Sequence, residues 1–337
     1  MNGPRTTIQR DPLRPARFAL GFLCSALTGA CLMLSMAAWA DEPATDSDSL
    51  AVQRLELMRS RAESIAFVAP DEGFPKHLEP EPLFRYDDHT RGYVDGTVWR
   101  LGKAGRPLAI ITAELHPRYG GGGPKVVYDF LSLTEIPFVA RSNDVPGWSP
   151  RGSAVTMKPL PNGPAAGATT GGSPGAFSFS IHDRYRIQSA KAPASFGHRS
   201  DSSEQTPRGA TEVLRLAQIK RLATRFSGTQ EVEGQKVQLR LLPTPIGRYV
   251  PAEHERADAA MFLLVNGRNP ALILFIENDG EQWSFGIGRL SLPSDLTAKL
   301  DGDVVYHQPR LTNSAWKEPY TASNSPATIP GYEATQP

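Results

Sequence analysis

The sequence predicts an α+β protein of two homologous units, each a helix packed on an antiparallel sheet, joined by a disordered linker. Residues 80–114 repeat without a gap at 243–277, with nine identities in 35 positions. Each copy follows a helix-like apolar stripe and contains several β-branched segments bounded by turns. A stretch poor in large apolar residues separates the copies. Together these features indicate an internal duplication.

The first 40 residues have the pattern of a secretion signal. Four arginines lie before residue 18, and residues 18–39 carry no charge. Ala38-Trp39-Ala40, followed by an acidic residue, fits the small-x-small rule for signal peptidase. We therefore predict a signal peptide at 1–40, cleaved after Ala40, and a periplasmic or secreted protein exported by the general secretory route.

The same segment permits two other outcomes. An uncleaved N-terminal helix could anchor the protein in the membrane, because 22 uncharged residues can span a bilayer. A lipid could be attached to Cys31, but the three residues before it lack the leucine that such a site needs. Cleavage is the interpretation adopted here, and it leaves no membrane span in the mature chain.

Composition excludes several classes of protein. Lys and Arg number 36 against 35 for Asp and Glu, which argues against a nucleic-acid binder acting through massed phosphate contacts. The two cysteines, Cys24 and Cys31, both fall in the signal. A cysteine-free mature chain cannot form a disulfide, a thiolate metal site or a cysteine nucleophile. No motif predicts a cofactor.

The first unit is predicted at 50–160, after a disordered segment at 41–49. Apolar residues with 3-4-3 spacing indicate its helix: Leu55, Met58, Ala62 and Ile65. Alternation and β-branched content predict its strands at 97–101, 108–115, 126–133 and 154–158.

The second unit, at 211–310, repeats this order. The helical stripe recurs at Leu216, Ile219, Ala223 and Phe226. Its strands are predicted at 237–242, 259–265, 271–277, 283–290 and 304–307. Short turns between strands favour antiparallel hairpins in both units. The pattern leaves open whether the units share one sheet or form two domains.

Besides residues 41–49, two longer segments are predicted to lack fixed structure. Gly, Pro, Ser, Thr and Ala make up 31 of the 50 residues at 161–210, so this stretch cannot bury enough apolar surface to fold. We predict a flexible linker there. The proline-containing tail at 311–337 is predicted to be disordered as well.

Two runs carry a resemblance to a known family. Residues 93–102 (YVDGTVWRLG) and 239–249 (LRLLPTPIGRY) resemble an uncharacterised family of secreted planctomycete proteins. The resemblance covers about residues 50–310. It implies no activity, ligand or catalytic residue.

The duplicated polar residues are the first candidates for a binding site: Arg85, Asp95 and Glu114 in the first unit, and Arg248, Asp258 and Glu277 in the second. In one interpretation each Arg pairs with a carboxylate of its own unit and supports the fold. In the other, the equivalent acids face each other in a pseudo-twofold cleft, where their pKa values would split and they could act as acid and base. The first interpretation is preferred.

A glycine-rich loop, 119–125, is particular to the first unit. It precedes a strand and lacks the Ser or Thr that a phosphate-binding loop places after its Lys, so we predict a hairpin loop. Loops that differ between copies are places where function resides, and His116 and Arg118 beside it join the candidate ligand-binding residues. The seven histidines lack metal-ligand spacing, so no metal site is predicted.

These observations favour an exported binding or envelope-associated protein without enzymatic activity. Its partner would be an unknown protein or small molecule of the cell envelope, not a nucleic acid. The alternative is a hydrolase-like enzyme that uses the duplicated carboxylates at the cleft. No residue is predicted to be catalytic in the favoured interpretation.

Overall fold

The computed structural model describes residues 46–89, 92–143, 145, 147–163, 208–232, 234–251, 257–312 and 315–332. The predicted secretion signal with its cleavage site at Ala40, most of the predicted linker (164–207) and the last five residues of the predicted tail lie outside this part of the chain.

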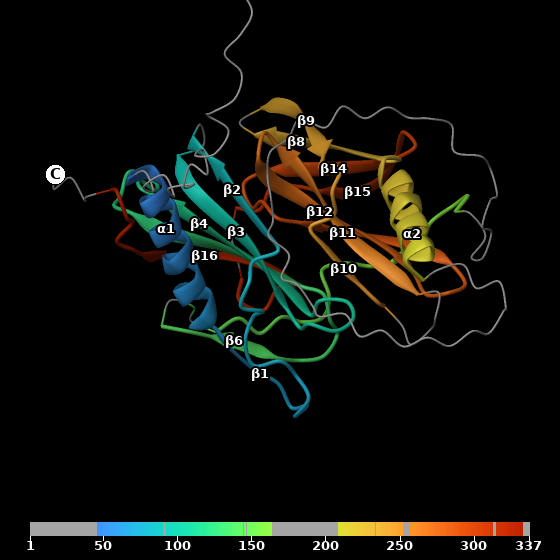
Figure 1. Cartoon of the computed structure of the whole chain (residues 1–337). Helices are drawn as coiled ribbons and strands as arrows, with labels where there is room; N and C mark the ends of the chain where they lie inside the picture. The colour runs from blue at the N-terminus through green and yellow to red at the C-terminus, as the bar shows by residue number, and fades with distance from the viewer. Residues whose placement is uncertain are drawn as a thin grey trace, which may run out of the picture. The chain divides into compact units, whose positions relative to one another are not determined.

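The first half of the chain contains one helix and most of a five-stranded antiparallel sheet (Figure 1). Its elements are α1 (Asp46–Glu63), β1 (Ala66–Val68), β2 (Phe84–Asp88), β3 (Tyr93–Leu101), β4 (Ala109–His116), β5 (Lys125–Ser132), β6 (Val139–Arg141) and β7 (Lys158–Pro159). The fifth strand, β16 (Tyr320–Pro326), comes from the C-terminal part of the chain. The sheet order is β16-β5-β4-β3-β2, and β1 pairs separately with β6.

The second half contains one helix and most of a nine-stranded antiparallel sheet. Its elements are α2 (Arg208–Ala223), β8 (Phe226–Val232), β9 (Gln235–Leu241), β10 (Gly247–Tyr249), β11 (Asp258–Asn266), β12 (Asn269–Asn278), β13 (Trp283–Arg289), β14 (Asp295–Leu300) and β15 (Asp303–Gln308). The sheet order is β15-β14-β8-β9-β11-β12-β13-β7, with β10 also beside β11. Because β7 joins this sheet and β16 joins the other, each half contributes a strand to the sheet of the other half.

Three apolar cores explain the arrangement of layers. The first lies between α1 and the five-stranded sheet, where Met58 is fully buried. The second lies between α2 and the nine-stranded sheet and contains Ile219. The third is shared, because side chains from both sheets, such as Val98 of β3 and Phe275 of β12, pack together in it. The layer order is therefore helix, sheet, sheet, helix, and the two halves share one core instead of forming separate domains.

The central strands are buried on both faces, which explains their sequences. All residues of β3 and β12 are buried, as are all but the last of β11. A strand covered on both faces favours a continuous apolar run over alternation, as in residues 259–265 (AAMFLLV). The prediction of antiparallel sheets with helices is confirmed in this coarse form, although the described chain is mostly β.

All three segments predicted to be disordered contain ordered residues. Helix α2 begins at Arg208, inside the predicted linker 161–210. Helix α1 begins at Asp46, inside the predicted disordered segment 41–49, and its acidic first turn suits the positive end of a helix dipole. The predicted disordered tail 311–337 contains β16, which pairs with β5 over seven residues. Proline indicated disorder here, but Pro319 precedes the strand and Pro326 ends it, where little of the hydrogen-bond ladder is lost.

The predicted strand at 154–158 is wrong except at its end, because only Lys158–Pro159 pairs with β13. The preceding apolar side chains instead lie over glycines of β13. A Cβ at Gly286 would lie 2.5 Å from Met157 Sδ, and one at Gly288 would lie 3.0 Å from Val155 Cγ2. The alternation in this segment therefore reflects side chains that fill glycine-lined space in the shared core.

Corresponding strands of the two halves pair in the same register. In the first half Gly96 lies opposite Tyr86 on β2 and Glu114 on β4. In the second half Ala259 lies opposite Tyr249 on β10 and Glu277 on β12. The positions of the sequence repeat are thus also equivalent positions in the two sheets.

Candidate functional site

Arg85 and Asp95, two of the predicted site residues, form an ion pair that joins α1 to the first sheet. The Arg85 guanidinium donates to both carboxylate oxygens of Asp95, at 2.8 Å through Nε. It also donates to the backbone oxygen of Ala51 in α1 at 2.6 Å. Bonding to Asp95 raises the pKa of Arg85. Because Asp95 is only 4% exposed, its carboxylate is committed to this pair.

Arg248 and Asp258 repeat the arrangement in the second half. Arg248 Nη2 donates to Asp258 at 2.6 Å, and Nη1 donates to Glu212 of α2 at 3.2 Å. In each half the Arg thus links a helix to a buried carboxylate of the sheet. This geometry suits a structural role for all four residues.

Glu277 is held by residues of both halves. Its carboxylate accepts two hydrogen bonds from Arg106, at 2.7 and 2.6 Å, and one from the Tyr249 hydroxyl. Arg106 lies in the turn between β3 and β4, so this pair connects the two sheets across the shared core. Bonding to Glu277 raises the pKa of Arg106. Glu277 is 4% exposed and its charge is neutralised.

Glu114 occupies the equivalent position in the first half, but its surroundings differ. The Tyr86 hydroxyl donates to it at 3.0 Å, and His116 Nε2 lies 3.0 Å from its other oxygen. In the described part of the chain no arginine bonds to Glu114. The sequence repeat places Asn269 where the first half has Arg106. Glu114 and Glu277 therefore occupy equivalent positions in the two sheets but have different bonding partners.

Asp129 of β5 is a second buried acid near Glu114. It accepts a hydrogen bond from Thr112 Oγ1 at 3.0 Å and another from the Tyr320 hydroxyl of β16. Burial, followed by repulsion from Glu114, raises the pKa of Asp129 to about 7 against the opposing effect of these hydrogen bonds. Sequence analysis missed Asp129, although a single acid inside the apolar run 126–133 was an available signal.

Protonation of Asp129 makes stability depend on pH. Because its pKa is about 7 in the folded protein and about 4 in an unfolded chain, the folded state binds more protons between these values. Its contribution to the free energy of unfolding therefore falls as pH rises from 4 to 7, at roughly 1 kcal/mol per pH unit. Urea unfolding at several pH values should show a shallower decline for Asp129→Asn. Asp301→Asn, on the surface, should keep the wild-type slope between pH 5 and 7, and equal slopes for all three proteins would contradict the assignment.

His116 lies at the end of β4, beside the glycine-rich loop. Its ring packs against Tyr93 and Tyr119 with centroid distances of 5.4 and 5.3 Å. Arg118 is exposed. The structure thus brings His116 and Glu114 together, whereas no hydrogen bond or ion pair recorded between described residues joins Arg118 to them.

Two pockets formed by described residues contain none of the six repeated charged residues Arg85, Asp95, Glu114, Arg248, Asp258 and Glu277. One of these pockets, about 350 Å³, lies beside the segment 79–83. Two of its charged side chains are already bonded, since Glu81 pairs with Arg59 and Arg100 donates to backbone oxygens of the turn after β3.

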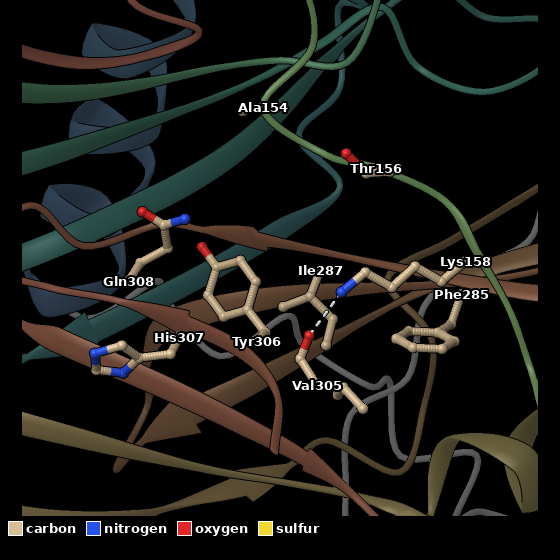
Figure 2. Close-up of a pocket in the computed structure, with 9 residues that line it drawn as sticks. All are labelled: Ala154, Thr156, Lys158, Phe285, Ile287, Val305, Tyr306, His307 and Gln308. Atoms are coloured by element: carbon tan, nitrogen blue, oxygen red, sulfur yellow. Dashed lines mark hydrogen bonds between the residues drawn. The ribbon is translucent and has the colours of Figure 1, made fainter. Parts of the chain in front are cut away.

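The other pocket is more enclosed and lies between the two ends of the nine-stranded sheet (Figure 2). This β7–β15 groove has a volume of about 230 Å³ and is lined by Ala154, Thr156, Lys158, Phe285, Ile287, Val305, Tyr306, His307 and Gln308. Figure 2 shows Lys158 reaching across to β15, where its Nζ donates to the Val305 oxygen at 2.9 Å. Burial raises the pKa of Tyr306 to about 12, so its hydroxyl remains a donor at neutral pH. The lining includes Lys158 and His307 and no carboxylate.

Neither a family model, nor a curated protein, nor a solved structure matches this chain. The resemblance to secreted planctomycete proteins stays a prediction.

The described residues contain no helix that combines the length and apolar character needed to cross a membrane. They also contain no cluster of three or more His, Cys, Asp or Glu side chains arranged to hold a metal ion.

No residue of the β7–β15 groove was predicted to belong to a site. Segments about 130 to 150 positions apart in the chain form the groove, and no local pattern marks any of them. One feature of the sequence could have pointed to this region: the two predicted units differ in sequence after their fourth predicted strands.

Proposed function

We propose that this chain is an exported binding protein, without enzymatic activity, that takes its ligand in the β7–β15 groove. One contrast carries the proposal. The buried carboxylates of Asp95, Asp258 and Glu277 are neutralised by arginines within the protein. The groove instead is lined by apolar and polar side chains in similar measure, and these can contact a ligand from outside the chain. Export rests on the predicted signal at 1–40.

A screen of thermal stabilisation with a mixed library of small molecules and peptides tests the groove. Thr156 is exposed at the groove wall, so Thr156→Trp should fill the space, while the matched control Thr156→Ala leaves it open. Ligands should shift the melting temperature of wild type and Thr156→Ala but not of Thr156→Trp. Ligands that stabilise all three proteins equally would place binding elsewhere.

Export is tested separately, by fractionation and by the mass of the mature N-terminus after expression of the full chain. We expect a chain that begins at Asp41 in the exported fraction. A chain that keeps residues 1–40 and sediments with membranes would favour the uncleaved anchor.

We also infer that the two halves arose by duplication of one helix-and-sheet unit. The shared register of β2-β3-β4 and β10-β11-β12 supports this origin. So does the recurrence of an Arg–Asp pair beside each helix.

The alternative function is that of a hydrolase-like enzyme, and one observation favours keeping it. Glu114 contacts His116 and lies near Asp129, whose pKa of about 7 would let Asp129 exchange a proton near neutral pH. A panel of fluorogenic ester, peptide and glycoside substrates tests this idea. Any activity should fall at least about 100-fold in Glu114→Gln, while Glu81→Gln on the surface retains it. Activity that persists in Glu114→Gln would eliminate this site.

A further inference from the structure

We propose that the β7–β15 groove binds an extended peptide segment of a partner protein, with one aromatic side chain in the groove and its backbone beside β15. This inference rests on the proposed function and names the chemistry of the ligand. The two halves of the chain themselves provide the argument, because each has a space beside the residue that pairs with Ala140 of β6 or Ala298 of β14. The described residues fill that space in the first half but not in the second.

In the first half the gap is closed by the chain itself. Trp148 lies opposite Ala140 of β6, as Tyr306 of β15 lies opposite Ala298 of β14. On its other side, the segment after Trp148 bonds to the C-terminal part of the chain: Ser149 N donates to the Trp316 oxygen at 2.8 Å, and Arg151 N to the Lys317 oxygen at 3.0 Å. A turn at 315–318, in which Glu318 N donates to the Ala315 oxygen at 3.0 Å, therefore completes the wall.

Aromatic side chains fill the space that this segment closes. Trp148 is fully buried and its Nε1 donates to the Glu318 oxygen at 3.0 Å. Phe130 packs against Trp148 and Trp316, with centroid distances of 5.3 and 6.2 Å. The first half thus shows what completes such a gap: a segment of chain that carries a large aromatic residue, Trp316.

In the second half no described segment takes this place. β15 is the last strand of the sheet, and the side chains of Val304 and His307 on it are exposed. At the other end β7 pairs with only two residues of β13, whereas β16 covers seven residues of β5. Among the described residues, the side chain of Lys158 crosses the groove and donates to the Val305 oxygen of β15. The edge of β15 can therefore accept a further strand.

The size and charge of the groove indicate the kind of segment. Its volume, about 230 Å³, is below the roughly 300–1,000 Å³ of common small-molecule sites and suits one large side chain. Phe285 and Ile287 of the lining are buried, and the partly buried Tyr306 offers the larger surface against which an aromatic ring could pack. Lys158 and His307, with no carboxylate in the lining, favour acidic residues beside the aromatic one.

The probe is an amide-capped nine-residue peptide with a central tryptophan between two aspartates and with threonine and valine elsewhere. Fluorescence anisotropy of the labelled peptide, with protein recovered after expression of the full chain, should show saturable binding. Replacing the peptide tryptophan by alanine, or its flanking valines by proline, should weaken binding by at least about tenfold. Hydrogen exchange at 303–308 should slow when the peptide binds.

Two groove variants locate the binding. Thr156→Trp should abolish it, whereas Thr156→Ala should keep it. Should Thr156→Trp fail to fold, Lys158→Glu gives an independent test. It should weaken binding of the aspartate-flanked peptide by about tenfold and strengthen binding of a lysine-flanked peptide.

Three outcomes would overturn the proposal: no saturable binding to wild type, binding unchanged in Thr156→Trp, or no protection of β15. Self-association that Thr156→Trp removes would assign the groove to a second copy of the chain instead. A library ligand could stabilise wild type and Thr156→Ala but not Thr156→Trp, while the peptide does not bind. That result would overturn this inference and leave the proposed function standing.

Discussion

Arg106→Met is expected to lower the free energy of unfolding by about 3 kcal/mol, because it leaves the Glu277 carboxylate buried without a counter-charge. Glu277 would keep only the hydrogen bond from Tyr249. The substitution removes the charge while keeping much of the side-chain volume, so lost packing contributes little. Urea unfolding followed by circular dichroism measures the loss.

The chain offers a matched control for this variant. Arg268 and Asp87 also join the two halves by an ion pair, at 2.7 Å, but their side chains are 65% and 41% exposed. Solvent-exposed pairs contribute little, so Arg268→Met should cost less than about 1 kcal/mol. Equal effects of the two substitutions would mean that burial of Glu277 does not determine the strength of the link between the sheets.

Trp148→Ala is expected to cost about 3–5 kcal/mol, since it removes a fully buried indole between Phe130 and Phe138. The loss includes the hydrogen bond to the Glu318 oxygen. This variant opens the gap of the first half that the segment 316–318 closes. Its unfolding midpoint in urea should fall well below that of the wild type.

Tyr306→Ala changes the equivalent position in the second half and serves as the control. Tyr306 is only partly buried and faces the open groove, so the cost should be about 1 kcal/mol. Equal losses in the free energy of unfolding for Trp148→Ala and Tyr306→Ala would mean that the two gaps are filled to the same extent. The β7–β15 groove could then not be interpreted as the unfilled equivalent of the gap at Trp148.

Local patterns predicted most of each helix and the hairpins, although Ile65 lies after α1 and Phe226 is the first residue of β8. In the helical stripes, Met58 and Ala62 of α1 are buried, as are Ile219 and Ala223 of α2. A face with period 3.6 must pack against something, and here each stripe packs on its own sheet. Hairpins were predictable because tight turns connect strands that are neighbours in the sequence, as between β3 and β4 and between β11 and β12.

The candidate site was only partly predictable. The repeat singled out the Arg–Asp pairs and the two glutamates, because residues kept in both copies can be compared within one sequence. It could not distinguish Glu277 from Glu114, since Arg106 reaches Glu277 from 171 positions away. Asp129 and its partner Tyr320 were missed for the same reason, as they are 191 positions apart.

The sequence by itself determined the order of most helices and strands, their apolar faces and the antiparallel connections, because these depend on residues that are close in the chain. Only the tertiary structure decided that the halves share a core, that β7 and β16 are exchanged between the sheets, and that one gap is filled while the other remains a groove. Those features depend on contacts between distant segments, whose free energy arises from burial against surfaces that no local pattern describes.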